Sequence, residues 1–259
     1  MVPDVTRPLD GQVAIVTGAS RGIGRALALG LADAGAAVMC AARTEVEAPG
    51  GLPGTIHATA EAIVSRGGEA LARRCDIGRA DEITTLVEST SARFGRVDVL
   101  VNNAMTPTRA SFAESTVEQW DESMRVNVRS LYLTARAVLT PMVEHGGGSI
   151  VNISSGAADP KVTGMPPGYL TYSVAKAALE RFSTALAGEL APHGIAVNAL
   201  RPGAVKTETA VHELGADWDW TGWAAPEAVV PATVFLAGQR GDGLTGCIVD
   251  STQFGVTWP

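Results

Sequence analysis

Short apolar runs alternate with segments of helical periodicity along the whole 259-residue chain. The apolar runs show no alternation with polar residues, as expected of strands that are buried on both faces. This pattern predicts an α/β fold: a single doubly wound domain over residues 1–259, with about seven parallel strands and helices on both faces of the sheet. The predicted strands lie near residues 13–18, 38–43, 72–77, 97–104, 149–155, 195–203 and 246–250.

Three stretches depart from the regular alternation. Residues 117–144 predict one long helix. Residues 44–56 are rich in Pro and Gly and lengthen the loop after the second strand, while residues 203–224 are Trp-rich and follow a strand end. We expect both of these stretches to be irregular loops, the second at the sheet edge where ligands bind in folds of this type.

The charge and the cysteines limit the environment. The net charge is -7 and no basic run occurs, so neither nucleic acid nor an anionic membrane is expected as a partner. The N-terminal MVPDVTRPLDG has no apolar signal core, and no apolar stretch is long enough to cross a bilayer. The widely spaced Cys40, Cys75 and Cys247 predict free thiols in a reducing compartment. We therefore expect a cytoplasmic protein.

The histidines are isolated in the sequence and show no spacing typical of metal ligands, so no metal site is expected. They are His57, His145, His193 and His212.

The segment TGASRGIG, from Thr17 to Gly24, lies between the first predicted strand and the first predicted helix. Glycines at 18, 22 and 24 let the backbone approach a diphosphate, and the helix start supplies unpaired N–H groups and the positive end of its dipole. The same turn could be a plain strand-to-helix connection. Its place in the first βαβ unit of a parallel sheet favours dinucleotide binding.

The spacing Gly-x-x-x-Gly-x-Gly resembles that of the short-chain dehydrogenase/reductase family. Further motifs follow in the order typical of that family: CDI with Asp76, NNA at 102–104, Asn127, NISS at 152–155, YSVAK at 172–176 and RPGAVKT at 201–207. The segment LPGTIHATAEAIVSRGGEAL is similar to a branch described as hydroxysteroid-dehydrogenase-like. The resemblance covers nearly the whole chain and implies an NAD(P)(H)-dependent oxidoreductase with a Rossmann-like fold.

The resemblance also implies which residues contact the dinucleotide. Asp76 is expected near the adenine amino group, Asn103 and Ala104 along the adenosine half, and Val205 and Thr207 near the carboxamide and phosphates. The complete implied set is Gly18, Ser20, Arg21, Gly22, Ile23, Gly24, Arg43, Asp76, Ile77, Asn103, Ala104, Tyr172, Lys176, Pro202, Gly203, Val205 and Thr207.

The end of the second strand, CAARTE, favours NADP(H) as the cofactor. An acidic residue there would accept bonds from the ribose hydroxyls, whereas a nearby cation accommodates the 2'-phosphate. Ala42 occupies the position of the acid, Arg43 follows it, and Arg21 in the glycine turn adds a second cation. The alternative is NAD(H), with Arg43 solvated and Glu45 or Glu47 reaching back to the ribose.

The segment YLTYSVAK, residues 169–176, offers two tyrosines before one lysine. A phenol has an ordinary pKa of about 10, and an ammonium about 4 Å away supplies roughly the 4 kcal/mol needed to make it a base near neutral pH. Tyr172 and Lys176 lie one turn apart on a shared helical face, whereas Tyr169 follows PPG, where no regular helix is expected. We predict Tyr172 as the general acid/base and Lys176 as its electrostatic partner and ribose ligand.

Ser155 is predicted to hold the substrate oxygen by a hydrogen bond. Ser154 competes with it, but successive strand residues face opposite sides, so only one serine can point into the site, and the family pattern favours Ser155. Asn127 resembles the helix asparagine of the family, which implies that it kinks or hydrates its helix and holds a water linking Lys176 to solvent. Its alternative role is that of a solvated or core-capping asparagine.

The chain departs from the family pattern in three places. Seventeen residues separate Ser155 from Tyr172, and the surplus contains DPKVTGMPPG, which we expect to lie over the active site. Met105 replaces the glycine usual after NNA, so the backbone there is expected to stay farther from the cofactor. VDSTQFG, near the C-terminus, replaces the usual Asp-Gly-Gly.

WDWTGW at 218–223, with Met165 and Pro167, suggests an apolar lid over a hydrophobic carbonyl or secondary alcohol, although the tryptophans could equally serve a subunit contact. The helices predicted near 118–144 and 172–191 resemble those through which relatives form dimers and tetramers, so we expect a homodimer or homotetramer. A non-catalytic dinucleotide-binding regulatory or scaffold protein is the alternative from another class. The presence of all four polar catalytic residues argues against it.

Overall fold

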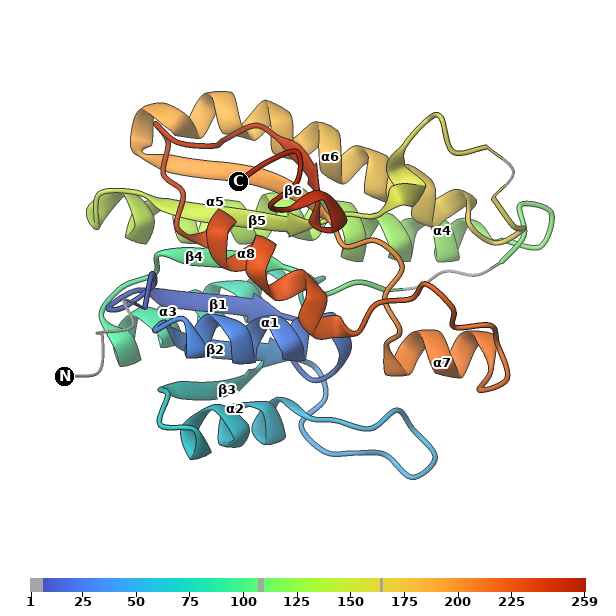
Figure 1. Ribbon diagram of the computed structural model, residues 1–259, viewed down its shortest axis with the longest axis horizontal. Helices are drawn as coiled ribbons and strands as arrows, with labels where there is room; N and C mark the ends of the chain where they lie inside the picture. Colours follow the sequence, from blue (N-terminus) through green and yellow to red (C-terminus); the bar gives the residue numbers. More distant parts are fainter. Residues whose placement is uncertain (1–6, 107–109, 164) are drawn as a thin grey trace.

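The computed structural model describes residues 7–106, 110–163 and 165–259. Within them seven strands form one parallel sheet in the order β3-β2-β1-β4-β5-β6-β7 (Figure 1), which confirms the predicted doubly wound, Rossmann-like fold. The strands are β1 (Val13–Thr17), β2 (Ala37–Ala42), β3 (Ala70–Arg74), β4 (Val99–Asn102), β5 (Gly148–Ile153), β6 (Ile195–Arg201) and β7 (Ile248–Asp250).

The helices cover both faces of this sheet. Their bounds are α1 (Gly22–Asp33), α2 (Ile56–Ser65), α3 (Ala80–Phe94), α4 (Val117–Met124), α5 (Ser130–Glu144), α6 (Leu170–Leu190), α7 (Glu208–Leu214) and α8 (Val230–Ala237). Alternate residues of β1 face opposite sides, so Ala14 and Val16 pack with α1, α2 and α8, while Ile15 packs with α3, α5 and α6. The two hydrophobic cores are therefore separated by the sheet itself.

The single long helix predicted over 117–144 is interrupted. Helix α4 ends at Met124, residues Arg125–Arg129 form a π-helical segment, and α5 begins at Ser130. Asn127 lies in this segment, and its side chain exchanges two hydrogen bonds with the backbone of Thr106, from Thr106 N to Oδ1 (2.9 Å) and from Nδ2 to Thr106 O (3.0 Å). The π turn thus lies where the helix is tied to the loop after β4, and π-bulges are frequent at functional sites.

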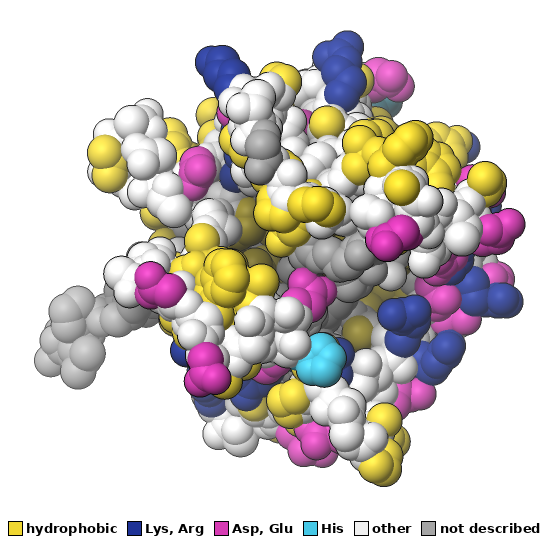
Figure 2. Space-filling view, turned by 90° about the vertical axis from the view of Figure 1, so that its right-hand side faces the viewer, with side chains coloured by type: hydrophobic (Ala, Val, Ile, Leu, Met, Phe, Trp, Pro, Cys, Tyr) yellow, Lys and Arg dark blue, Asp and Glu magenta, His cyan; other side chains and the backbone are white. Residues whose placement is uncertain are grey.

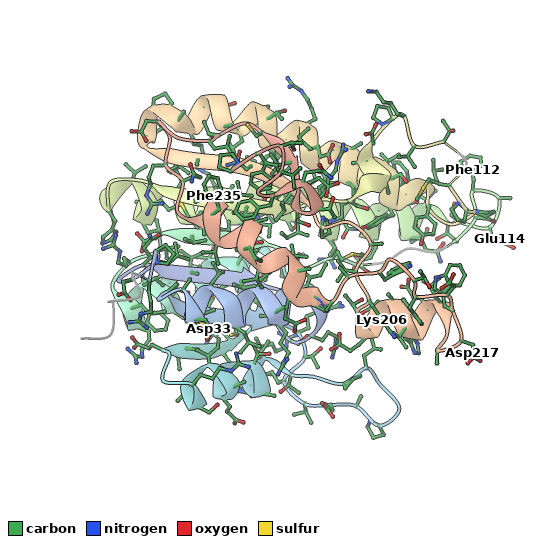
Figure 3. All side chains as sticks on the ribbon, viewed as in Figure 1. Asp33, Phe112, Glu114, Lys206, Asp217 and Phe235 are labelled. Atoms are coloured by element: carbon green, nitrogen blue, oxygen red, sulfur yellow. The ribbon has the colours of Figure 1, made fainter. Side chains whose placement is uncertain are left out.

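The stretch 203–224, expected to be irregular, contains helix α7. Its N-cap is Thr207, whose side-chain oxygen accepts a hydrogen bond from Ala210 N at 3.1 Å. The excursion that carries α7 is closed at its base by an isolated bridge between Val205 and Ala224. In Figure 3, Lys206 lies at the base of this excursion and Asp217 at its outer end. The Thr-Glu-Thr-Ala sequence at the start of α7 was a capping signal that the tryptophan content obscured.

Helix α6 begins at Leu170, two residues before the predicted start at Tyr172. Tyr169 is its N-cap residue, and the preceding Gly168 has a φ of 90°, a conformation that favours glycine. Tyr172 and Lys176 therefore belong to the first two turns of a regular helix, which fixes their relative orientation.

Candidate active site

A cavity of about 420 Å³ opens at the carboxyl ends of the central strands, where ligands bind in open α/β sheets. Figure 2 faces the edge of the molecule that carries α7 and shows it hollowed, with hydrophobic and charged side chains around the hollow. Apart from Asn127, every residue predicted for the cofactor or for catalysis lines this cavity. The structure thus brings together residues that are spread from Gly18 to Thr207 in the sequence.

The glycine turn forms one wall of the cavity. Gly18 and Gly22 have φ values of 69° and 54°, and a Cβ on Gly24 would lie 2.1 Å from the carbonyl oxygen of Gly18. The N-cap of α1, Arg21, makes no side-chain capping hydrogen bond. The first turn of α1 therefore presents backbone N–H groups and the positive helix end to the cavity, which fits the diphosphate of a dinucleotide.

Asn103 joins the glycine turn to the end of β4. Its Nδ2 donates to Thr17 O at 2.9 Å, and its backbone N donates to Thr17 Oγ1 at 3.0 Å. Ala104 N donates to the same hydroxyl at 3.1 Å. Asn103 lines the cavity, but its amide group is used to fix the walls of the site relative to each other.

The far end of the cavity carries Arg43 and Asp76, at the ends of β2 and β3. Within the described residues Arg43 forms no hydrogen bond or ion pair with another side chain or with the backbone. Asp76 Oδ1 accepts a hydrogen bond from Gly78 N at 2.9 Å. A cation and a carboxylate at this position are suited to the adenosine half of a dinucleotide.

Arg21 lies on the cavity wall, but its guanidinium is engaged by the loop 44–56. Nε donates to Pro53 O at 2.8 Å, and Nη2 donates to Gly54 O at 2.9 Å and to Leu52 O at 3.2 Å. The structure therefore gives Arg21 an anchoring role in addition to the cofactor contact expected from the sequence. The Pro- and Gly-rich sequence of the loop could have indicated this role, because its backbone carbonyl groups need hydrogen-bond donors.

The two glutamates of this loop point elsewhere. Glu47 Oε1 accepts a hydrogen bond from Gly54 N at 2.6 Å, and Glu45 lies 3.5 Å from His57 Nε2. Neither glutamate lines the cavity. This arrangement does not support the alternative in which one of them contacts the ribose.

Lys176 is buried, with 5% of its surface exposed, and its Nζ donates a 2.6 Å hydrogen bond to Ile153 O at the end of β5. Burial lowers the pKa of Lys176 from 10.5 to about 8, and the charge of Glu180, one turn further along α6, opposes this shift. The ammonium is therefore present at neutral pH, close to its titration range.

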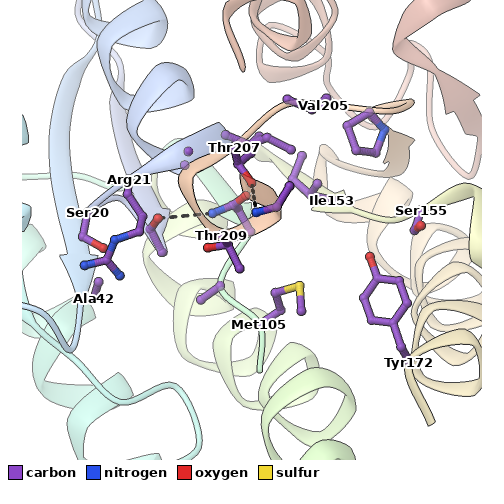
Figure 4. Close-up of a pocket in the computed structure, with 18 of the residues that line it drawn as sticks. Ser20, Arg21, Ala42, Met105, Ile153, Ser155, Tyr172, Val205, Thr207 and Thr209 are labelled. Atoms are coloured by element: carbon purple, nitrogen blue, oxygen red, sulfur yellow. Dashed lines mark hydrogen bonds between the residues drawn. The ribbon is translucent and has the colours of Figure 1, made fainter. Parts of the chain in front are cut away.

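The phenol ring of Tyr172 lies 5.7 Å from Lys176 Nζ, measured to the ring centroid. In Figure 4 its hydroxyl group points toward Ser155 across one end of the cavity, while Arg21 and Ala42 lie at the other end. Tyr169 also lines the cavity and packs edge-on against Tyr172, with 6.2 Å between ring centroids. The geometry places Tyr172, rather than Tyr169, beside both Ser155 and Lys176.

The two serines of NISS have different surroundings. Ser154 is 2% exposed, and its hydroxyl donates to Glu180 Oε1 at 2.7 Å. Ser155 is partly exposed, and its Oγ accepts a hydrogen bond from Ala157 N at 3.2 Å, which leaves its own hydrogen available to donate. Of the two, only Ser155 can therefore offer its hydroxyl hydrogen to a ligand while Ser154 binds Glu180.

Asn127 does not line the cavity. In addition to its bonds with Thr106, its Nδ2 donates to Ser123 Oγ at 3.0 Å. The side-chain amide therefore holds the loop that carries Met105, and any role for Asn127 toward Lys176 must involve its backbone or the shape of the π turn.

Several lining residues were not predicted. Helix α7 supplies Thr209, Ala210, Glu213 and Leu214. The Trp-rich sequence indicated that residues 203–224 lie near the ligand. Because helix α7 was not predicted, nothing indicated which of its residues face the cavity. Glu180 and Arg201, which contact the active-site segments from behind, were missed because nothing in the sequence relates two charges that are 21 residues apart.

The apolar residues expected beside WDWTGW separate into two places. Trp223 lines the active-site cavity, whereas Met165 and Pro167 line a second hollow of about 660 Å³ with Phe112, Leu170 and other residues. Phe112 lies at the outer edge of the molecule (Figure 3). The expectation that Met165 and Pro167 form a lid over Ser155 and Tyr172 is wrong in this structure, because both residues line the second hollow with Leu170 and Val174 of α6.

No helix in the described residues is both long enough and apolar enough to span a bilayer. Their histidines, cysteines and carboxylates form no group of three or more that could hold a metal ion.

Known proteins are similar to this chain in sequence and in fold. The sequence profile of the short chain dehydrogenase family matches residues 12–216. A 3-oxoacyl-[acyl-carrier-protein] reductase of Synechocystis is 38% identical over 77% of this chain and 76% of its own, and a D-threitol dehydrogenase of Mycolicibacterium smegmatis is 34% identical over 92% and 90%. A solved short chain dehydrogenase from Burkholderia cenocepacia, in complex with NADP, has a TM-score of 0.82 and is 28% identical, over 94% of this chain and 97% of its own.

The fold and the site define an NAD(P)-dependent oxidoreductase. The chain belongs to the short-chain dehydrogenase family, as its motifs predicted.

Proposed function

We propose that this enzyme uses NADP(H) to interconvert a carbonyl group and a secondary alcohol on a small hydrophobic molecule, with Tyr172 as the general acid/base. The observation that carries the proposal is the convergence of Ser155, Tyr172 and Lys176 on the cavity that the glycine turn also lines. A binding protein without turnover would need the glycine turn, but not a phenol that faces a serine hydroxyl next to a buried ammonium.

The residues present fit the dinucleotide. The first turn of α1, from Gly22, would hold the diphosphate, Asp76 and Ile77 the adenine, and Lys176 and Tyr172 the nicotinamide ribose. When bound, NADP(H) supplies or accepts the hydride. The protein positions this group and controls the proton.

The proton chemistry belongs to Tyr172. Ser155 would donate a hydrogen bond to the substrate oxygen and fix its position, and the phenol would then give a proton to that oxygen during reduction or take it during oxidation. The ammonium of Lys176 favours the phenolate form of Tyr172 electrostatically. Because Lys176 is buried and held by Ile153 O, its charge acts in a medium of low dielectric constant, where it is most effective.

The NADP(H) preference is supported by Arg43. This side chain lines the cavity at the end of β2, directly after Ala42, and the carboxylates of Glu45 and Glu47 are engaged by His57 and Gly54 N. A guanidinium that forms no ion pair within the described residues is suited to the 2'-phosphate. The test is the ratio of kcat/KM with NADPH to that with NADH. A ratio above about ten supports the proposal, whereas a ratio below one contradicts it.

The apolar end of the cavity supports a hydrophobic substrate. Met105, Tyr169, Leu214 and Trp223 lie on its wall and can bury apolar surface without demanding charge. A screen of ketones, such as acetophenone, cyclohexanone and α-tetralone, alongside a sugar alcohol, tests this assignment. Turnover confined to the sugar alcohol would contradict it.

Substitution of Tyr172 tests the mechanism. Tyr172→Phe keeps the ring that packs against Tyr169 but removes the acid, so kcat should fall by about 10²- to 10⁴-fold. Tyr132→Phe, on the exposed face of α5, is the matched control and should retain wild-type turnover. Equal turnover in the two variants would refute the assignment of Tyr172 and favour the scaffold alternative or another acid.

We further propose that the enzyme is a homo-oligomer whose contact includes α4, α5 and α6. Several large apolar side chains on these helices are 39% to 71% exposed: Val117, Trp120, Tyr132, Leu170 and Val174. Single exposed apolar residues are ordinary, but a group of them on neighbouring helices indicates an interaction surface. Light scattering of the full chain tests this assignment, and a monomeric mass at micromolar concentration would contradict it.

A further inference from the structure

Four charged or hydroxyl side chains meet directly behind the active site. Glu180 on α6 is 6% exposed, and its carboxylate accepts hydrogen bonds from Arg201 Nε at 2.7 Å and from Arg201 Nη2 at 2.9 Å. Its Oε1 also accepts the hydroxyl of Ser154 at 2.7 Å. Arg201 Nη1 donates in turn to Asp159 Oδ2 at 3.1 Å. The two carboxylates and the guanidinium form one connected network.

This network joins the segments that carry the catalytic groups. Ser154 immediately precedes Ser155 at the end of β5, and Arg201 ends β6 just before Pro202 and Gly203 of the cavity wall. Asp159 lies in the lengthened loop between Ser155 and Tyr172. One carboxylate on α6 thus holds together the ends of two strands and the loop in which the chain departs from the family pattern.

The serine pair depends on this anchor. Successive residues at a strand end face opposite sides, so the bond from Ser154 to Glu180 turns Ser155 toward the cavity. A loss of this bond would free the Ser154 hydroxyl to rotate and loosen the strand end that carries Ser155. Displacement of a positioning group by about 1 Å can lower a rate by about 10²-fold.

Glu180 also acts on Lys176. The two residues are one helical turn apart and both are buried, and the carboxylate stabilises the ammonium against its desolvation. Among the described residues Glu180 is the charged group that raises the pKa of Lys176. Arg201 from β6 contacts Glu180, and Asp159 from the loop contacts Arg201. Without the carboxylate, the ammonium would lose its proton at a lower pH.

We propose that Glu180, held by Arg201, is a positioning residue of this enzyme: it orients Ser155 through Ser154 and keeps Lys176 charged beside Tyr172. The inference rests on the proposed function, because it assumes that Ser155, Tyr172 and Lys176 act on the substrate.

The test compares Glu180→Gln with Glu189→Gln, an exposed residue on the same helix that supplies the same change of charge. For alcohol oxidation with NADP⁺, Glu180→Gln should lower kcat by about 10- to 100-fold. The acidic limb of its pH profile should move upward by about one unit, because a neutral Lys176 no longer assists ionisation of Tyr172. Glu189→Gln should match the wild type in both measurements.

Glu180→Asp separates positioning from a merely structural role. It keeps the charge, so its acidic limb should return to the wild-type position even if kcat stays low. If kcat falls in Glu180→Gln at all pH values alike, with no movement of the limb, Glu180 only supports the fold and the inference is overturned. If Glu180→Gln does not fold, the double variant Glu180→Leu with Arg201→Leu removes the pair without leaving a buried charge and should show the same movement.

A readout without turnover separates this inference from the proposed function. The chain has three tyrosines, so the near-ultraviolet phenolate absorbance of each protein minus that of its Tyr172→Phe counterpart follows Tyr172 alone. In Glu180→Gln this titration should move to higher pH. If Tyr172→Phe is fully active, the proposed function fails, while the titration still decides whether Glu180 acts on Tyr172. An unmoved titration overturns the inference even where Tyr172→Phe is inactive.

Discussion

Lys176 Nζ and the backbone carbonyl oxygen of Ile153 are joined by a 2.6 Å hydrogen bond, which fastens the catalytic helix α6 to the end of β5. The bond is made by an ammonium that burial disfavours, since the pKa of Lys176 is lowered from 10.5 to about 8. The same burial that makes the charge effective in catalysis also makes it costly for folding.

This cost predicts a pH dependence of stability. The folded state binds fewer protons at Lys176 than the unfolded state between about pH 8 and 10.5, so the contribution of this group to the free energy of unfolding rises with pH across that window. The rise should amount to about 3 kcal/mol. Lys176→Met should abolish this rise and be more stable than the wild type below about pH 8. Urea unfolding of both proteins at several pH values measures it, and parallel pH curves would contradict the burial of the ammonium.

The two serines after β5 should respond differently to removal of their hydroxyl groups. Ser155→Ala should lower kcat/KM by about 10²-fold or more, because the residue lines the cavity. It should cost only about 0.5–1 kcal/mol of stability, for the loss of the capping bond from Ala157 N. Ser154→Ala removes a buried hydrogen bond to the carboxylate of Glu180 and should cost about 1.5–3 kcal/mol of stability. Steady-state kinetics and urea unfolding check both variants. The reverse assignment of the two effects would show that Ser154 is the serine at the substrate.

Two glycine substitutions test the packing of the glycine turn. In Gly24→Ala the new Cβ would lie 2.1 Å from Gly18 O, so the turn must shift, and the protein should lose about 1–3 kcal/mol and much of its NADP(H) affinity. Gly188→Ala, within α6, meets no atom within 4 Å and should stabilise the protein by about 0.5–1 kcal/mol. Thermal unfolding and cofactor titration measure these effects. If Gly24→Ala binds NADP(H) as tightly as the wild type, the diphosphate does not bind at the glycine turn.

The two arginines at the adenosine end should have separable roles. Arg43→Ala should lower the preference for NADPH over NADH by about tenfold or more, because it removes a charge-assisted phosphate contact. Arg21→Ala removes three hydrogen bonds to the loop 44–56, so its main effect should be to make this loop more susceptible to proteolysis. Kinetics with both cofactors and limited proteolysis distinguish them. If the cofactor preference changes in Arg21→Ala but not in Arg43→Ala, then Arg21 rather than Arg43 contacts the 2'-phosphate.

Much of the fold and the arrangement of the site followed from local patterns. Apart from β3, which ends in Arg73 and Arg74, and the short β7, the strands are mainly apolar runs. The glycine turn and the Tyr172–Lys176 spacing are contiguous in sequence, so each could be interpreted without tertiary information. The same locality explains why the helix that carries Tyr172 and Lys176 was predicted over 172–191, clear of PPG.

The features that were missed depend on contacts between distant segments. The π turn at Asn127 coincides with a pair of hydrogen bonds to Thr106, and the anchoring of Arg21 depends on where the loop 44–56 returns. The pairing of Glu180 with Arg201 is likewise visible only once β6 lies beside α6. Helix α7 is the exception, because its capping sequence was present and was outweighed by the tryptophans around it.

The bridge between Val205 and Ala224 has a consequence for how this enzyme could change its substrate. It closes the α7 excursion at its base, with Lys206 N donating to Ala224 O and Ala224 N donating to Ala204 O, both at 2.9 Å. A closed base isolates β6 from changes in length or sequence further out. We therefore expect that Leu214 and Trp223, which line the cavity, can be replaced to change the substrate without moving Ser155, Tyr172 and Lys176.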